Sequence, residues 1–253
     1  TGVTLTPEGK ILYDYAQRIV RLRREAAEKI QQIHENAGGD VYVAASTIPA
    51  TYILPRALSD FKDKHGDIRV FMKTEDSQEV MNMVLDREVE IGVIGKKPYH
   101  AKLLVQPLWS DRLILVVPKG HRWIKQKAVD LEDLVKEPFV LREKGSATRE
   151  VFETYIKENK SFSLSQFNVC AELGSSAAVV EAVLAGLGVS VLSIHAVLRE
   201  LASKMLFEIP MLSCRIERLF HLIYLKQFDL RLHHKTFVDF LREYKADRLN
   251  LRK

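Results

Sequence analysis

The chain up to about residue 35 carries apolar residues that recur with the period of a helix. Thr6 is suited to cap a helix, Pro7 to its first position and Glu8 to its first turn, so we expect the helix to begin here. The main apolar positions lie seven residues apart, which forms a narrow seam suited to a partner helix. We expect dimerisation through this seam, but an amphipathic helix lying on its own domain stays open because the heptads are few. The seam residues are Leu12, Tyr15, Ile19, Leu22, Ala26 and Ile33.

Beyond Gly39, short runs of β-branched residues alternate with helical stretches, which is typical of α/β layers with a largely parallel sheet. Two predicted helices carry apolar stripes, and we expect Pro55 to bend the first of them or to mark its start. The stripes are Leu54, Ala57, Leu58 and Phe61, and Val180, Val183, Leu184 and Leu187. The predicted strands span residues 41–45, 68–73, 90–94, 113–118, 166–172, 188–192, 206–209 and 216–225.

Two distant segments repeat one pattern, in which a strand ends, small hydroxyl residues follow and a helix begins. They span residues 43–49 and 139–148, and their likeness predicts two similar lobes. One long strand and one long helix remain after the second lobe, which is too little for a third domain. We therefore expect them to complete the first lobe. The chain then passes between the lobes near residues 109–112 and again near 210–213. Two crossings predict a hinge.

The length of 253 residues, at about 150 residues per domain, indicates one large or two modest globular domains. Charged residues make up 28% and the formal charge is +5. Residues 215–253 hold ten Lys and Arg against five Asp and Glu, which indicates either a solvated helix face or a surface for nucleic acid. Cys170 and Cys214 form no CxxC pattern, so we expect buried, reduced thiols. We find no apolar run of membrane-spanning length and no secretory signal, and we expect a cytoplasmic chain if residue 1 lies near the natural start.

The hydroxyl residues of the repeated pattern are candidates for binding an anion. Ligands of open parallel sheets bind beyond the carboxyl ends of strands, where helix N-termini supply unpaired N–H donors. If the two lobes face each other, these hydroxyls converge on a cleft for a small anion or polar acid. Plain N-capping is the alternative for each residue. The candidates are Ser46, Thr47, Ser146 and Thr148.

Other motifs indicate no catalysis. Gly186 and Gly188 follow a helix and precede a strand, the reverse of a dinucleotide-binding loop, so we expect a helix-ending turn. His233 and His234 are adjacent on a predicted helix and point about 100° apart, so they cannot share a metal, and we expect them at the surface. The sequence has no HExxH, GxSxG or Walker pattern. We therefore expect no enzyme, no metal and no cofactor.

Several short stretches, in order along nearly the whole chain, resemble LysR-type transcriptional regulators. They are LTPEG at residues 5–9 with Tyr15 and Ala16, ASTIP at 45–49, YILP at 52–55, EIGV at 90–93, GSATR at 145–149 and AGLGV at 185–189. The resemblance implies an α/β fold with two Rossmann-like subdomains and a double-crossover hinge, like type 2 periplasmic binding proteins, after a long linker helix. It implies the end of a wing and the linker helix in residues 1–38, subdomain I in 39–109 and 210–253, and subdomain II in 110–209.

The resemblance also implies an effector-sensing role. Promoter DNA would be bound through an N-terminal winged helix-turn-helix domain that this chain lacks, and the protein would form homodimers or homotetramers. The effector would be a small molecule. Residues 46–49 (STIP) resemble most the branch of the family linked to sulfur and related anion metabolism, which implies a sulfur oxyanion or an organic acid. Gly95 departs from relatives with a hydroxyl there, which leaves room for a larger ligand or removes one donor. The implied effector contacts are Ser46, Thr47, Ile48, Gly95, Ser146, Ala147 and Thr148.

Two other functions fit the same lobes. A solute-binding protein for a transporter is the main alternative, but it would carry an export signal and has no use for a heptad-patterned helix. A transferase or lyase would need an acid–base pair in the cleft. The linker helix and the lack of a signal favour the regulator.

Overall fold

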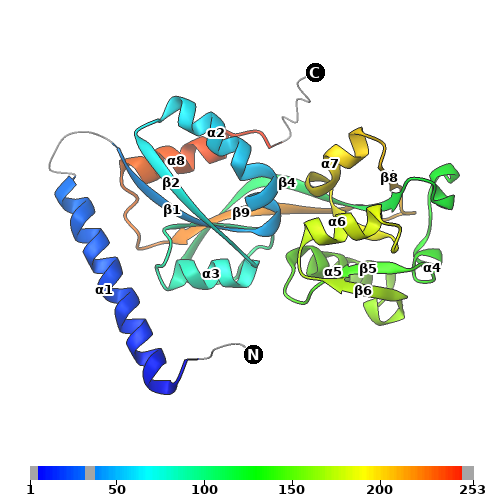
Figure 1. Cartoon of the computed structure of the whole chain (residues 1–253), viewed down its shortest axis with the longest axis horizontal. Coiled ribbons are helices and arrows are strands. Elements are labelled where there is room, and N and C mark those ends of the chain that lie inside the picture. The colour runs from blue at the N-terminus through cyan, green and yellow to red at the C-terminus, as the bar shows by residue number, and fades with distance from the viewer. Residues whose placement is uncertain (1–4, 32–37, 247–253) are drawn as a thin grey trace.

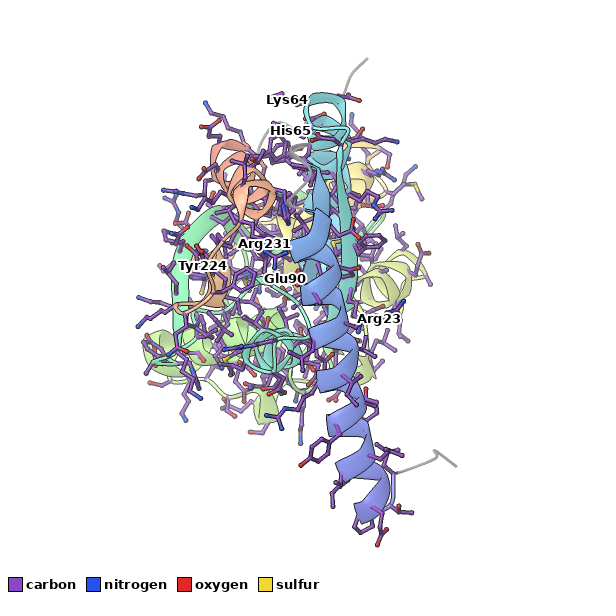
Figure 2. The ribbon with its side chains drawn as sticks, turned by 90° about the vertical axis from the view of Figure 1, so that its left-hand side faces the viewer. Arg23, Lys64, His65, Glu90, Tyr224 and Arg231 are labelled. Carbon is purple, nitrogen blue, oxygen red and sulfur yellow. The ribbon has the colours of Figure 1, made fainter. Side chains whose placement is uncertain are left out.

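The computed structural model describes residues 5–31 and 38–246. Helix α1 (Pro7–Gln31) begins where the sequence predicts, because the Thr6 hydroxyl accepts a hydrogen bond from the backbone N–H of Gly9 at 3.0 Å. Figures 1 and 2 show α1 extending away from the body of the molecule. The predicted end of the helix, near residue 35, lies outside the described residues.

A seven-stranded sheet runs through the molecule in the order β2-β1-β3-β9-β4-β7, and β8 also pairs with β4. Strands β2, β1 and β3 are parallel, whereas β9 and β4 run antiparallel to their neighbours, so the sheet is less parallel than predicted. The strands are β1 (Gly39–Ser46), β2 (Ile68–Glu75), β3 (Ile91–Ile94), β4 (Leu103–Pro118), β7 (Ser190–Ser193), β8 (Leu206–Ile209) and β9 (Ile216–Leu225). A separate parallel pair consists of β5 (Phe139–Arg142) and β6 (Val169–Leu173).

The elements form two lobes that share β4 and β9, as Figure 1 shows. The first lobe holds the π-helical turn η1 (Pro49–Ile53), α2 (Leu54–Lys64), α3 (Ser77–Leu85) and α8 (Leu232–Glu243). The second holds η2 (Arg122–Lys125), α4 (Leu131–Leu134), α5 (Ala147–Lys160), η3 (Leu164–Gln166), α6 (Ser176–Leu184) and α7 (Ile194–Ala202). Pro55 lies in the first turn of α2 and marks its start, as predicted.

Strands β4 and β9 carry the chain between the lobes. Their pairing runs from Leu103 opposite Leu225 to Leu113 opposite Ile216, with a register shift between Pro107 and Ser110. The later part of β4 then pairs with β7 and β8 of the second lobe. The lobes therefore share one antiparallel pair of strands, while the exact subdomain boundaries stay a prediction.

The largest apolar cluster joins the two lobes on the side of α2, α6 and α7. It includes Ile53 and Ala57 from the first lobe and Val180 and Ala196 from the second. This cluster packs the two lobes against each other.

Two groups of residues differ from the sequence predictions. His233 and His234 are buried, with 6% and 1% of their surface exposed, so the predicted surface location is wrong. The ring of His233 packs over Gly39, where a Cβ would come within 2.7 Å of it, and the ring of His234 meets Phe228. Both cysteines are free thiols, but Cys170 is exposed and Cys214 is half-buried rather than buried.

The boundaries of strands and turns differ less from the predictions. The predicted strand 113–118 is the second half of β4, whose first half contains Gln106 and Pro107 and is only partly buried. The predicted strand 166–172 starts later because Ser163 forms a capping box with Gln166 and begins a 3₁₀ turn. Gly186 has a φ of +79° after α6, which confirms the helix-ending turn.

Candidate ligand-binding cleft

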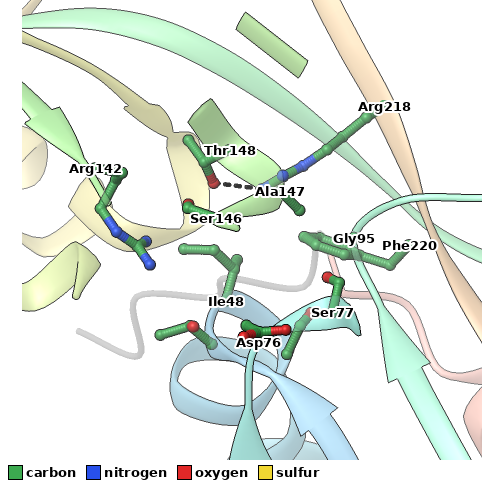
Figure 3. Close-up of a pocket in the computed structure, with 12 residues that line it drawn as sticks. Ile48, Asp76, Ser77, Gly95, Arg142, Ser146, Ala147, Thr148, Arg218 and Phe220 are labelled. Atoms are coloured by element: carbon green, nitrogen blue, oxygen red, sulfur yellow. Dashed lines mark hydrogen bonds between the residues drawn. The ribbon is translucent and has the colours of Figure 1, made fainter. Parts of the chain in front are cut away.

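Six chain segments from the two lobes meet at one cavity, shown in Figure 3. They are the end of β1, the start of α3, the residue after β3, the end of β5, the start of α5 and strand β9. All seven residues predicted to contact an effector line this cavity, although their binding role stays a prediction. The predicted residues are Ser46, Thr47, Ile48, Gly95, Ser146, Ala147 and Thr148, and the others that line it are Asp76, Ser77, Arg142, Arg218 and Phe220. We call this space the inner cavity.

The hydroxyl groups of the inner cavity are not used as helix caps. Ser146 is the N-cap residue of α5, but its side chain makes no capping hydrogen bond. The N-cap of η1 is Ile48, which follows Ser46 and Thr47 and has no side-chain cap. Ser46 and Ser146 are 6% and 4% exposed, and neither hydroxyl has a partner within the described residues. These hydroxyls are therefore available to a bound molecule.

The side chain of Arg218 brings a fixed positive charge to the inner cavity. Its Nε donates to Asp111 Oδ2 at 2.7 Å, and its Nη2 donates to the hydroxyl of Thr148 at 3.2 Å. The guanidinium lies 5.1 Å from the ring centroid of Phe220. A guanidinium carries five N–H donors, so the Nη1 donors remain for the cavity after these two bonds.

Asp111 is held in turn by the second lobe. The hydroxyl of Ser193 donates to Asp111 Oδ1 at 2.7 Å, and His195 Nε2 lies 4.0 Å from the same oxygen. The side chain of Asp111 is fully buried and that of Arg218 is 5% exposed. These hydrogen bonds fix the orientation of the guanidinium. A guanidinium held in this way is suited to bind a carboxylate or another oxyanion.

Gly95 of the first lobe lies beside that guanidinium. A Cβ built on Gly95 would lie 3.3 Å from Arg218 Nη1 and 3.4 Å from the Cβ of Ala147. The space left by the absent side chain is therefore bordered by Arg218 and by α5 of the other lobe. The sequence suggested room for a larger ligand or the loss of one donor, and the structure shows a guanidinium beside that position.

A second arginine, Arg142, lies on the opposite wall of the inner cavity in Figure 3. Its Nε and Nη2 both bond the carboxylate of Glu143 at 2.7 Å, and its Nη1 donates to the Ser176 hydroxyl. Arg142 is 4% exposed. Because its charge and donors are largely used by Glu143 and Ser176, it contributes less to a ligand than Arg218 does.

The sequence predicted the hydroxyl residues but missed Arg218, Arg142, Asp76, Ser77 and Phe220. Arg218 alternates with apolar residues on a strand that is otherwise largely buried, and a charged side chain there is the one signal that pointed to it. Its partner Asp111 is 107 positions away in the chain, which no local pattern reveals.

The inner cavity is small in this arrangement of the lobes. Its volume of about 20 Å³ is enough for one water molecule, which needs about 10–15 Å³. A larger ligand therefore requires the lobes to move apart or must extend beyond the inner cavity.

Within residues 5–31 and 38–246, no group of three or more His, Cys, Asp or Glu side chains could hold a metal ion. No helix in this part of the chain has both the length and the apolar content to span a bilayer. The donors at the cavity are hydroxyls, a guanidinium and the N–H groups at the start of α5, a set that suits an oxyanion.

The predicted dimerisation seam is exposed on α1. The described seam residues Leu12, Tyr15, Ile19 and Leu22 are 71%, 58%, 64% and 58% exposed, and Ala26 is also exposed. Ile33 lies outside the described residues. The seam does not pack against the lobes of its own chain. A partner helix would bury these apolar side chains, so dimerisation stays a prediction.

Comparison with known proteins identifies related sequences over most of the chain. The sequence profile of the LysR substrate binding domain matches residues 34–246. The uncharacterized HTH-type transcriptional regulator MJ0300 of Methanocaldococcus jannaschii is 36% identical over 195 residues, which are 76% of this chain and 64% of that protein. The HTH-type transcriptional activator CmpR of Synechocystis is 26% identical over 239 residues, which are 94% of this chain and 77% of that protein. The chain thus spans less than two thirds of the length of MJ0300.

Solved structures share the fold. The regulatory domain of Synechocystis CcmR in complex with 2-PG has a TM-score of 0.73 and 26% identity, covering 81% of this chain and 96% of that one. The effector binding domain of QuiR in complex with shikimate has a TM-score of 0.72 and covers 83% of this chain and 99% of that one. At 17% identity the likeness to QuiR shows the fold alone.

Proposed function

The chain belongs to the family of LysR-type transcriptional regulators, and we propose that it is the effector-sensing part of such a regulator. The observation that carries this proposal is the inner cavity, where unpaired hydroxyls of both lobes meet one guanidinium. The relatives are named transcriptional regulators, which is a non-enzymatic role. They do not support the transport protein that was the main alternative.

We propose a small acid or oxyanion as the effector. Hydrogen bonds to a charged group contribute about 1.5–3 kcal/mol each, and micromolar affinity needs about 8 kcal/mol, so about four such bonds suffice. Ser46, Ser146 and Arg218 Nη1 supply donors that the described chain leaves unused, and the amides at the start of α5 add more. The related CcmR domain is described in complex with 2-PG. An organic acid and a sulfur oxyanion both fit this donor set.

The effector would act by changing how the lobes are arranged. A ligand shifts an equilibrium only as far as it binds one arrangement better than the other. With room for one water in the inner cavity, the arrangement described here discriminates strongly by size. Binding would therefore select a lobe separation that matches the ligand, and β4 and β9 would carry the adjustment between the lobes.

The rest of the regulator follows from the family. We propose that the chain assembles into a homodimer or homotetramer through α1 and the lobes, and that promoter DNA is bound through a helix-turn-helix domain before residue 1. Lobe geometry would then change the spacing of the DNA-binding domains. The site of action would be the cytoplasm.

Calorimetric titration tests the proposal. Sulfate, phosphate, acetate, malonate and glycerate are titrated into the chain and into Thr47→Val, which keeps the side-chain shape but removes a hydroxyl from the inner cavity. Thr154→Val, on an exposed position of α5, is the matched control. We expect saturable binding that weakens by about tenfold in Thr47→Val, the loss of one charge-assisted bond, and not in Thr154→Val. Unchanged affinity in Thr47→Val would remove that loop from the site.

A further inference from the structure

A second and larger cavity adjoins the inner cavity at Ser77, which lines both. Its volume is about 280 Å³. It is walled by the start of α3 and the loop after β3 in the first lobe, and by the start of α5 in the second. We call it the outer cavity. Because the inner cavity holds little more than one water, an acid with one end in the inner cavity has its remaining atoms in the outer one.

The outer cavity carries an excess of positive charge. Lys96 Nζ lies 2.5 Å from Glu150 Oε2, and this ion pair links the loop after β3 to α5 across the two lobes. Lys97 Nζ lies 6.0 Å from the ring centroid of Tyr99 and has no carboxylate partner within the described residues. Two ammonium groups therefore face one carboxylate.

The inner cavity offsets only part of this excess. Asp76 is the one carboxylate that lines it, and Asp76 Oδ1 already accepts hydrogen bonds from the N–H groups of Gln78 and Glu79 at the start of α3. The positive charge of Lys97 also reaches the interior, since it helps burial to lower the pKa of His221.

We propose that the outer cavity is the subsite for a second anionic group, so that the effector is a small acid with two anionic ends, such as a phosphorylated or dicarboxylic acid. One end binds at Arg218 and the hydroxyls of the inner cavity, and the other meets Lys97 and Lys96. This inference rests on the proposed function and adds the charge and reach of the ligand.

The proposal fixes the direction of two opposite charge changes. Lys97→Gln removes the ammonium group without a carboxylate partner and weakens the binding of a dianion. Glu150→Gln removes the competing carboxylate and frees Lys96, so it strengthens dianion binding relative to monoanion binding. Lys97 is exposed and Glu150 is half-buried with its side chain 38% exposed, so we expect both variants to fold. For each variant we compare the dissociation constant of the acid with one anionic end to that of the acid with two. An effect of the substitution on lobe closure changes both constants alike and cancels in their ratio.

The test is a calorimetric titration of the whole chain with two matched pairs of acids, acetate with malonate and glycerate with 3-phosphoglycerate. We expect the acid with two anionic ends in at least one pair to bind about tenfold or more tightly than its partner with one anionic end, as one charge-assisted bond gives. Lys97→Gln lowers that ratio by about fivefold, Glu150→Gln raises it, and the control Lys157→Gln on the exposed face of α5 leaves it unchanged.

Two results would overturn the inference. Equal affinities within both pairs would show that the second charge contributes nothing. A ratio that Lys97→Gln leaves unchanged would show that the second charge binds elsewhere. Failure of the proposed function looks different, because then neither these acids nor sulfate and phosphate bind saturably to the unmodified chain.

Discussion

Arg218 and Asp111 face each other across strands β9 and β4 and form a buried ion pair, with 2.7 Å between Nε and Oδ2. The pair lies where the two strands pass between the lobes, and it is bonded to Ser193 and Thr148 of the second lobe. The charge that faces the inner cavity is therefore anchored in the strands that connect the lobes. A ligand at Arg218 acts directly on the part of the fold that sets their separation.

Removing one member of this ion pair should destabilise the fold strongly. Arg218→Met leaves the carboxylate of Asp111 buried without its charge partner, and such changes cost about 3–5 kcal/mol. Urea unfolding measures the change in the free energy of unfolding. The double variant Arg218→Met with Asp111→Leu should lose clearly less than the sum of the two single variants, whereas additive losses would contradict a coupled pair.

Ser146 and Ser175 are both N-cap residues, but replacement by alanine should lower mainly stability at Ser175 and mainly acid binding at Ser146. Ser175 accepts a bond from the N–H of Ala178 at 3.1 Å, so Ser175→Ala should cost about 1 kcal/mol of stability. Ser146 caps nothing with its side chain, so Ser146→Ala should cost less than about 0.5 kcal/mol. Acid binding, measured by calorimetry, should weaken in Ser146→Ala alone. Equal losses of stability would mean that Ser146 serves the helix instead.

Gly95→Ala should lower the affinity for acids with little effect on folding. The added Cβ would lie 3.3 Å from Arg218 Nη1, which is tight, so the guanidinium must shift away from the cavity. We expect a loss of about tenfold, the equivalent of one hydrogen bond to a charged group. Gly174→Ala is the control, since a Cβ there meets nothing within 4 Å. Unchanged binding in Gly95→Ala would separate Arg218 from the ligand site.

Buried histidines predict a loss of stability in mild acid. Burial, and then the charge of Arg231, lower the pKa of His233, while burial and the charge of Lys97 lower that of His221. The unfolded chain therefore binds more protons than the folded chain below the ordinary histidine pKa of about 6.5. This contribution to stability is fully present above that pH and is lost as the pH falls through it towards the folded pKa values.

Urea unfolding between pH 7.5 and pH 5 measures this slope. His233→Gln should make it shallower, because one of the two protonations is removed. Asp40 lies near His233 and raises its pKa, which partly opposes burial. A slope that is the same in the variant would mean that His233 titrates alike in both states.

The exposed seam of α1 predicts an assembly that one substitution disrupts. Ile19→Lys places a charge in the seam, where Ile19 is 64% exposed, whereas Val20→Lys places it beside the seam at a position of similar exposure, 65%. Sedimentation should show a dimer or tetramer for the chain and for Val20→Lys, and dissociation for Ile19→Lys. A monomer at tens of micromolar for the unmodified chain would refute the dimerisation seam.

The features that the sequence predicted are those with a local signal. A short apolar run marked β9 from Ile216 to Leu225, and hydroxyl residues after β1 and β5 marked the two sides of the cleft. Thr6 marked the start of α1 by its capping bond. Each of these depends on neighbours within a few residues, so the pattern alone was sufficient.

The features that the sequence missed depend on contacts between distant residues. Arg218 belongs to the site because Asp111 on a neighbouring strand holds it there. The two histidines of α8 are buried because Gly39, at the start of β1, leaves room for the ring of His233. Pro107 and the polar residues from Ser110 to Arg112 concealed a long strand, since they interrupt β4 where it passes between the lobes.

The central claim is that both lobes bind one small acid at the inner cavity. Amide chemical shifts of the ¹⁵N-labelled chain, followed during titration with glycerate and 3-phosphoglycerate, test it directly. We expect the signals of Thr47, Gly95, Ser146 and Thr148 to shift together with a single dissociation constant. Shifts confined to one lobe, or to residues away from the inner cavity, would contradict it.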